Sequence, residues 1–432
     1  MRSNLVNMVY RGNVEREKIS SLRPIHLESY RIRNAKHARD YNTADQVYLM
    51  LNSNPALKRE LKTYLGEGWD DSSKNITPIK RLDVDSLGIL HLIKKIKPSL
   101  IGPDEGFSKV RPILQKQADL FCEDIHRLLV YKRKIPRSVI MEYLKTLTAF
   151  HLSIYTQKLI HLLPEMVKAG KIEVPDNWSI VVDMTDNSDS KVAQLAIQDT
   201  EEVYNKLHNY VRATFQINAV MRRLKLDQDD SKHLEQALQV LKNPPAGFDS
   251  YFENRWDSLS EAQSKEDRET LMELTQFEES FFDKYIQAIM EQRGAYQLRY
   301  SPQFLDNICL KNDERGLMTK GRSRKHPRRF VIGTRLLETL VQIIVLNRDD
   351  KTNSYYTKSL SIEELMGALK SRYGLIINGV EEERFKNADI TTTLAFKDNV
   401  ESFKQKLRQI GFYSDLSDAY ILQKINPRYP IN

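Results

Sequence analysis

The sequence predicts a mainly α-helical protein, and three observations support this class. Apolar residues recur at steps of three and four along much of the chain, which is the spacing of one face of a helix. Gly and Pro, which interrupt helices, number only 16 and 15 in 432 residues. Hydrophobic residues make up 41% of the chain, enough for a packed core. At ~100–200 residues per domain, this length predicts two to four domains.

The first segment, residues 1–105, is basic and mixed in pattern. Residues 1–150 together carry a net charge of +10. Between residues 23 and 39, five basic residues face one acid, and tyrosines lie nearby. Cations interleaved with aromatic rings suit contacts with phosphates and bases. We therefore expect DNA contacts here from Arg31, Arg33, Lys36 and Arg39; a solvated basic surface is the alternative.

The second segment, residues 106–318, reads as a helical body whose second half is acidic. Residues 151–300 carry a net charge of −8. One stretch interrupts the helical pattern, because residues 178–183 (WSIVVD) are short, apolar and β-branched. Such a stretch predicts a buried strand or an extended insertion.

Three acids follow that stretch, at Asp183, Asp186 and Asp189. Acids at the end of a strand can ligate a metal, which would suit a metal-dependent nuclease. The favoured interpretation is different: Asp189 or Ser190 caps the next helix, since an oxygen at that position accepts a free backbone N–H. The sequence has no second acidic cluster at a fixed spacing that would complete a metal site.

The third segment, residues 319–330, is predicted to be a flexible basic linker. Gly321, Ser323 and Pro327 argue against a regular helix. No acid falls between residues 320 and 329, and we expect phosphate contacts from six cations: Lys320, Arg322, Arg324, Lys325, Arg328 and Arg329. A solvated linker, or docking onto an acidic protein surface, remains the alternative.

The last segment, residues 331–432, predicts three helices followed by a hairpin. The first runs from about Thr334 to Leu346. The second starts at Ser361, where Ser361 and Glu364 form a capping box, and ends at Gly374. The third runs from Asp398 to about Ile410, and two short strands follow Gly411. Three helices and a β-hairpin are the order of a winged-helix domain.

In a winged helix the third helix would read DNA. Its outward cations are Lys397, Lys404, Lys406 and Arg408, which could contact phosphates in the major groove. The preceding insertion holds three consecutive glutamates at 381–383, which would repel DNA. Winged helices also serve as protein-binding modules, so both roles stay open for this domain.

No catalytic motif is found, so we expect a non-enzymatic protein that needs no cofactor or metal. The sequence lacks a phosphate-binding P-loop, a dinucleotide fingerprint, a zinc-protease helix and a nucleophile elbow. Its two cysteines, Cys122 and Cys309, exclude a disulfide framework and a multi-cysteine zinc site. Both are expected to be buried free thiols.

Several segments resemble an accessory protein of bacterial methylation-associated anti-phage defence systems. They are residues 178–183 (WSIVVD) with 189–193 (DSKVA), residues 333–337 (GTRLL), and residues 411–420 (GFYSDLSDAY) with 427–429 (PRY). The resemblance covers about residues 180–430 in patches. It implies a bacterial protein whose partners modify, sense or cut DNA, and it carries no catalytic residues.

Together these observations predict a non-enzymatic DNA-binding and assembly subunit of a multi-protein defence system. Its expected partners are duplex DNA and other subunits, such as an ATPase or a nuclease. There is no signal-peptide pattern and no apolar run of membrane-spanning length, so we expect a cytoplasmic protein without a membrane partner. The alternatives are a pure protein-interaction scaffold and a metal-dependent nuclease.

Overall fold

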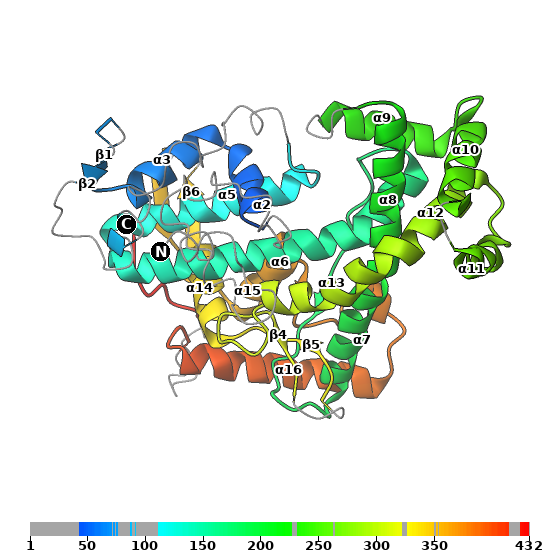
Figure 1. Cartoon of the computed structure of the whole chain (residues 1–432). Helices are drawn as coiled ribbons and strands as arrows, with labels where there is room; N and C mark the ends of the chain where they lie inside the picture. Colours follow the sequence, from blue (N-terminus) through cyan, green and yellow to red (C-terminus); the bar gives the residue numbers. More distant parts are fainter. Residues whose placement is uncertain are drawn as a thin grey trace. The chain divides into compact units, whose positions relative to one another are not determined.

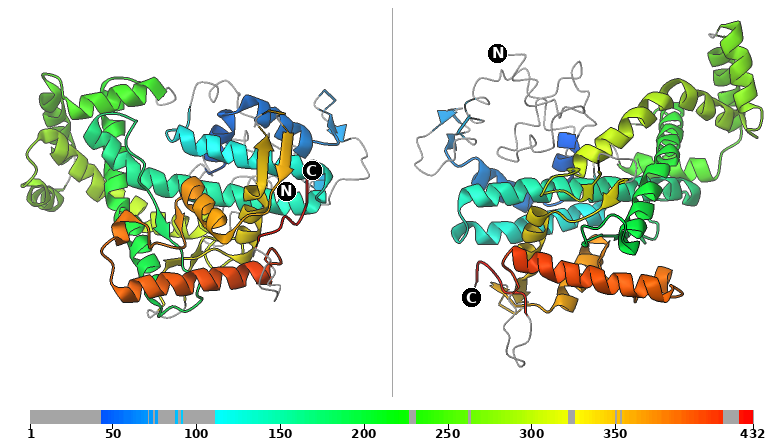
Figure 2. Two further views of the ribbon diagram at one scale, coloured as in Figure 1. Left: turned by 180° about the vertical axis from the view of Figure 1, so that it is seen from behind. Right: turned by 90° about the horizontal axis from the view of Figure 1, so that it is seen from below.

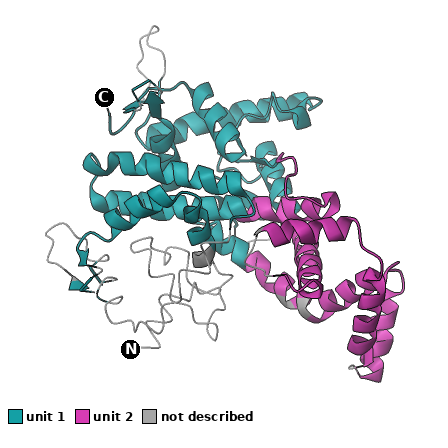
Figure 3. Cartoon of the chain, turned by 90° about the horizontal axis from the view of Figure 1, so that it is seen from above, with its two compact units in different colours: residues 1–155, 178–202, 304–432 teal, residues 156–177, 203–303 magenta. Residues whose placement is uncertain are grey.

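The computed structural model describes residues 43–70, 72–73, 75–76, 87–88, 91, 111–226, 231–261, 264–321, 326–349, 351–352, 354–413 and 424–431, and these residues are mainly helical. The chain divides into two compact units (Figure 3). Unit 1 comprises residues 1–155, 178–202 and 304–432, and unit 2 comprises residues 156–177 and 203–303. The predicted mainly helical class is therefore confirmed, and the strands are few and short.

Unit 1 holds most of the elements, and Figure 1 labels the larger ones. In chain order they are α2 (Thr43–Asn52), α3 (Pro55–Leu65), β1 (Trp69–Asp70), β2 (Asn75–Ile76), α5 (Gln115–Val130), the 3-10 helix η5 (Tyr131–Arg133), β3 (Ile180–Val181), β4 (Met318–Thr319), β5 (Arg329–Phe330), α14 (Thr334–Ile344), β6 (Leu346–Asp349), β7 (Ser354–Thr357), α15 (Ile362–Tyr373), β8 (Leu375–Ile376), the 3-10 helix η7 (Glu383–Phe385) and α16 (Ile390–Gln409).

Unit 2 is built from helices alone among its described residues. They are α8 (Leu207–Arg223), α9 (Ser231–Lys242), α10 (Phe248–Glu261), α11 (Lys265–Thr275), α12 (Phe281–Ile289) and the π-helical turn η6 (Met290–Gly294). Three further helices contribute residues to both units: α6 (Arg137–Ala169), α7 (Lys191–Asn205) and α13 (Ala295–Ile308).

The last third of the chain is folded onto the body of unit 1. Strand β3 pairs in parallel with β8, with Ile180 opposite Leu375 and Val181 opposite Ile376. Side chains from both strands form a buried cluster with Val192 of α7 and Phe396 of α16. A buried strand thus lies within the predicted stretch 178–183, at Ile180–Val181, and its partner lies almost 200 residues away in sequence.

The β6–β7 hairpin joins α14 to α15 and lies against α5 (Figure 2). The guanidinium of Arg127 on α5 donates to the carbonyl of Leu346, and the ring of His126 meets that of Tyr355 edge-on at 5.6 Å. The sequence pattern did not predict this hairpin, which adds two strands between the first and second helices of the last segment.

The three predicted helices of that segment are present. Helix α14 matches the first, and α15 has the expected capping box, with Gly374 at a φ of 72° closing it. Helix α16 begins at Ile390, eight residues before the predicted start. The physical reason is a cap: the Asp389 carboxylate accepts the backbone N–H of Thr392, and the buried Phe396 anchors the added turns.

Ile425 forms two antiparallel bridges with residues that flank α15 and α16. Ile425 pairs with Leu360, which precedes α15, and also with Tyr413, which follows α16. The predicted hairpin after Gly411 otherwise falls on residues 414–423, which lie outside the described residues.

The predicted basic linker begins and ends in a hairpin. Strand β4 pairs antiparallel with β5, with Thr319 opposite Arg329. The last residues of the predicted linker therefore belong to a strand, and residues 304–432 fall in unit 1.

A buried amide adds hydrogen bonds between α16 and the β3–β8 pair. The buried side chain of Asn399 donates to the carbonyls of Val182 and Ile377, at 2.9 and 2.8 Å, and accepts the N–H of Met184 at 2.7 Å. All three partners are backbone groups, and a buried backbone N–H or carbonyl needs a hydrogen-bond partner.

We expect the substitution Asn399→Leu to lower the free energy of unfolding by about 3 kcal/mol or more, because each buried polar group left unpaired costs about 1–3 kcal/mol. Urea unfolding checks this. The control, Gln405→Leu on an exposed position of the same helix, should stay within about 0.5 kcal/mol of the wild type. Equal effects of the two substitutions would contradict the role of this amide.

Candidate nucleic-acid interface

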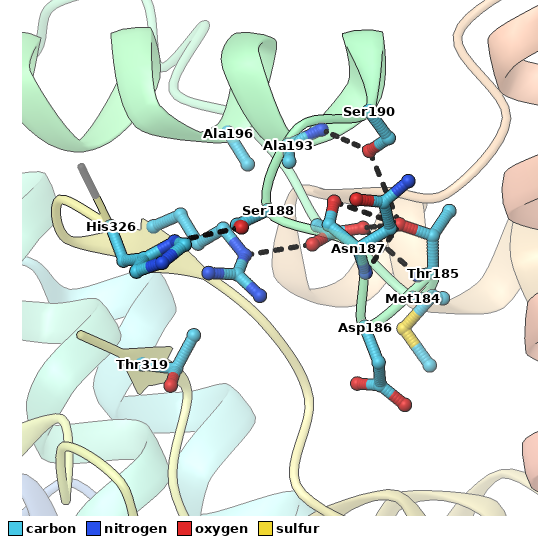
Figure 4. Close-up of polar contacts among 12 residues, drawn as sticks. Met184, Thr185, Asp186, Asn187, Ser188, Ser190, Ala193, Ala196, Thr319 and His326 are labelled. Atoms are coloured by element: carbon cyan, nitrogen blue, oxygen red, sulfur yellow. Dashed lines mark hydrogen bonds and ion pairs between the residues drawn. The ribbon is translucent and has the colours of Figure 1, made fainter. Parts of the chain in front are cut away.

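The loop after β3 contacts the predicted basic segment, as Figure 4 shows for His326, and it also contacts the predicted DNA-reading helix. His326, beside β5, lies with its Nδ1 2.8 Å from the Ser188 hydroxyl. Lys406 of α16 donates to the Asp186 carboxylate at 2.8 Å. Two segments that lie more than a hundred residues further along the chain thus both contact residues 183–190.

Asp183 anchors this loop. Its side chain is fully buried, and Arg329 of β5 donates to one carboxylate oxygen at 2.8 Å. The other oxygen accepts the backbone N–H and the hydroxyl of Thr185, at 2.9 and 2.7 Å. Both oxygens are therefore engaged by groups of the protein itself.

The end of the loop caps α7, as the favoured interpretation of the sequence expected. The Ser190 hydroxyl accepts the backbone N–H of Ala193 at 3.0 Å and lies 3.1 Å from the Thr185 hydroxyl. Within the described ranges, no group of three His, Cys, Asp or Glu side chains is placed to hold a metal ion. The contacts of Asp183 and Ser190 therefore hold this loop in place and cap α7.

The predicted linker cations have different surroundings. Arg328 donates to both oxygens of the nearly buried Asp306, at 2.7 and 2.9 Å, and Arg329 is paired with Asp183. Lys320 is half-buried, and its backbone is bound to the Asn312 side chain. Arg322, Arg324 and Lys325 lie outside the described residues. Two of the six cations are thus held by acids of unit 1.

The predicted cations of α16 are also mostly engaged. Lys404 pairs with Glu401 one turn away at 2.6 Å, and Lys406 pairs with Asp186. The guanidinium of Arg408 lies over the Tyr413 ring, 5.1 Å from its centre. Lys397 is exposed. The N-terminal set, Arg31, Arg33, Lys36 and Arg39, lies outside the described residues.

Sequence reasoning missed a second buried carboxylate, Asp124 on α5. It accepts hydrogen bonds from Tyr373 at 2.6 Å and from Arg372, and His151 lies 3.0 Å away through its Nε2. Burial alone would raise the pKa of Asp124, but these hydrogen bonds and positive charges outweigh it and lower the pKa below its usual value. The signal was available, since Asp124 falls on the apolar face between Phe121 and Leu128.

A third buried carboxylate, Asp199 on α7, was missed as well. Arg384 of η7 donates to both its oxygens, at 2.7 and 2.9 Å, and the backbone N–H of Val181 donates at 2.6 Å. Here burial is the larger influence and raises the pKa of Asp199, although Val181 and Arg384 oppose it. The pKa values of the two aspartates shift in opposite directions because their partners differ. Asp199 pairs with Arg384, whereas Asp124 contacts Arg372, the Tyr373 hydroxyl and the His151 ring.

The two cysteines are buried free thiols, as expected from the sequence. Burial raises the pKa of Cys122 to about 11, and burial also raises the pKa of Cys309. Both therefore stay protonated near neutral pH, and neither is suited to act as a thiolate nucleophile.

The described residues also line hollows in each unit. In unit 1 a cavity of about 660 Å³ lies between α6, α14 and the turn at 312–315. Its walls carry both charges, and these pair with each other: Arg315 with Asp313, and Arg335 with Glu338. In unit 2 a hollow of about 500 Å³ is lined in part by the first turns of α10 and α12.

Comparison with known protein families shows to which family the chain belongs. Residues 1–429 match the family described as methylation-associated defense system protein MAD7. The chain belongs to this family. The match covers nearly the whole sequence and confirms the resemblance seen in its patches. Neither a curated protein nor a solved structure matches the chain. Family membership connects the chain to a methylation-associated defence system.

No described helix is long and apolar enough to cross a membrane.

We expect Arg329→Met to lower the free energy of unfolding by about 3–5 kcal/mol, because Asp183 would remain buried without its cation. The control is Lys404→Met, which removes a partly exposed pair and should cost no more than about 1 kcal/mol. Urea unfolding measures both. If Arg329→Met left stability unchanged, Arg329 would be available for phosphate contacts after all.

Proposed function

We propose that this protein is a non-enzymatic assembly subunit of a methylation-associated defence system, and that it docks another subunit through a C-terminal winged-helix domain. Membership in the MAD7 family supports a role in the defence system, and the exposed apolar side chains of α16 support docking of a partner. The single observation that carries the proposal is the pair of large apolar side chains exposed on the first turns of α16.

The order of elements supports a winged helix. Helices α14, α15 and α16 are followed by a chain that returns at Ile425, between Leu360 and Tyr413. In a winged-helix domain, one strand before the second helix and two strands after the third helix form a small sheet. The β6–β7 hairpin and the β8 strand are additions to the basic pattern.

The exposed side of α16 is unlike that of a DNA-reading helix. Ile390 is 78% exposed and Leu394, one turn later, is 52% exposed. Val380, in the loop before the helix, is 44% exposed. Contiguous apolar side chains on a surface mark contacts with proteins more often than contacts with phosphates. An exposed helix with apolar residues at i and i+4 is also a common docking element.

Two observations support the non-enzymatic role. The sequence contains no recognised catalytic motif, both carboxylate oxygens of Asp183 accept hydrogen bonds within the protein, and Asp186 pairs with Lys406. The nuclease alternative would need those carboxylates free to ligate a metal.

The double substitution Ile390→Asp and Leu394→Asp should reduce recovery of a partner subunit about tenfold or more when the tagged chain is purified from cells that express the whole defence system. Removing the apolar contacts and placing charges there raises the cost of desolvation on docking. Quantitative mass spectrometry of the purified complexes provides the measurement.

Gln405→Asp is the matched control, because Gln405 lies three turns along the same side of α16, about 16 Å away. It should leave recovery unchanged, and thermal unfolding should be alike in all three proteins. Full recovery of every subunit by the double variant would remove α16 from the docking role.

Duplex DNA is the second candidate partner, and the distribution of charge favours it. The chain carries +8 overall, with +10 in residues 1–150. Lys397 is exposed on α16, where a winged helix contacts DNA. Arg322, Arg324 and Lys325 are further cations with no acid among them in the sequence. Their contribution would be electrostatic and independent of base sequence.

If duplex DNA is a partner, affinity should fall with salt, with a log–log slope of about −0.9 per phosphate contacted. Changing Arg322, Arg324 and Lys325 together to Gln should then make the slope less negative, by up to about 2.7. Fluorescence anisotropy with a labelled duplex measures this. The control variant changes three exposed cations of unit 2, Lys171, Lys225 and Lys265, to Gln. A slope near zero for the wild type, or equal changes in both variants, would contradict DNA binding by this segment.

A further inference from the structure

Helix α11 in unit 2 has one buried side that fixes its position. Leu271 packs with Trp256 of α10 and Ala288 of α12 in a small core. Thr275, one turn after Leu271, is also buried, and its hydroxyl donates to the Leu271 carbonyl at 2.8 Å. Figure 1 shows α11 next to α10 at the end of this helical group.

The other side of α11 presents large apolar side chains to solvent. Leu274 is 47% exposed, and Phe277, three residues later in the turn after the helix, is 86% exposed. Among the described residues with large hydrophobic side chains, Phe277 is the most exposed. Residues three apart around a helix end lie near each other, so the two side chains form one patch.

The turn that carries Phe277 is held in place from both sides. The N–H of Glu278 donates to the Thr275 carbonyl at 3.1 Å. Arg212 of α8 pairs with Glu278 at 3.4 Å and with Asp283 at 3.1 Å. Ser280 caps α12, because its hydroxyl accepts the N–H of Asp283. Phe277 is therefore exposed on an ordered turn.

Acids surround this apolar patch. Residues 264–280 contain six acids and two bases, a net charge of −4. The exposed glutamates among them are Glu266, Glu269, Glu273 and Glu279. We call Leu274, Phe277 and these four glutamates the α11 surface. An apolar centre with an acidic rim is complementary to apolar side chains flanked by Lys or Arg.

We infer that the α11 surface docks a basic amphipathic segment of another subunit of the defence system; this deepens the assembly role proposed above and rests on it. Nucleic acid is disfavoured, because the rim would repel phosphates. Self-association through this surface is also disfavoured, because a two-fold contact would place the acids of one copy against the same acids of the other.

Site-specific crosslinking tests the inference directly. A photoreactive benzoylphenylalanine replaces Phe277, whose exposure leaves room for the larger ring, in cells that express the whole defence system. We expect a crosslink to one other subunit, mapped by mass spectrometry to a peptide of net positive charge that contains aliphatic residues. The same photoreactive residue at Glu235, an exposed position of α9, is the control and should give at most one tenth of the yield.

Charge reversal gives a second measurement. Glu269→Lys together with Glu273→Lys should reduce the crosslink at 277 at least fivefold, and Glu235→Lys should leave it unchanged. The crosslink should also persist when Ile390 and Leu394 are both changed to Asp, so failure of the α16 docking role and failure of this surface are distinguishable. A yield at 277 no higher than at 235, a crosslink to an acidic peptide, or a crosslink only to a second copy of the chain would overturn the inference.

Discussion

Three aspartates buried in the first half of the chain depend on arginines from its last hundred or so residues. Asp124 is paired with Arg372, Asp183 with Arg329, and Asp199 with Arg384. A charge taken out of water costs several kcal/mol unless an opposite charge and hydrogen bonds compensate it. The carboxylates of α5, β3–α7 and α7 can therefore be buried only while the last third of the chain lies on them. The parallel β3–β8 pair and the Asn399 amide join the same two parts of the sequence.

This constraint changes how the charge pattern is understood. The sequence is basic, then acidic, then basic, and such a pattern suggests basic ends that face an anionic polymer. In unit 1, however, several cations of the last third face acids of residues 124–199 within the same chain. A cation bound to a buried carboxylate is not available to a phosphate without leaving that carboxylate uncompensated. Among the described residues, the surfaces that we propose to meet an external partner are the exposed side of α16 and the α11 surface.

Local signals predicted much of the fold. The capping box at Ser361 and Glu364, the glycine after α15 and the apolar steps of α14 gave those helices correctly, because each depends on neighbours in sequence. The start of α16 was placed too late, since Asp389 was not recognised as a cap. The β3–β8 pair could be expected only as a strand without a partner, because its partner lies far along the chain. The arginine–aspartate pairs escaped prediction for the same reason, although an acid on the apolar face of α5 was a usable sign.

The structure thus connects a helical body to a last segment that sequence patterns treat as a separate module. The buried ion pairs join that segment to the rest of unit 1, and the exposed apolar side of α16 is the basis of the assembly role that we propose. A double-mutant cycle at Asp124 and Arg372, using Asp124→Asn, Arg372→Met and both together, tests this account most directly by urea unfolding. The account predicts that the single losses do not add, with a coupling of about 2 kcal/mol between the two positions. Losses that add to within about 0.5 kcal/mol would contradict it.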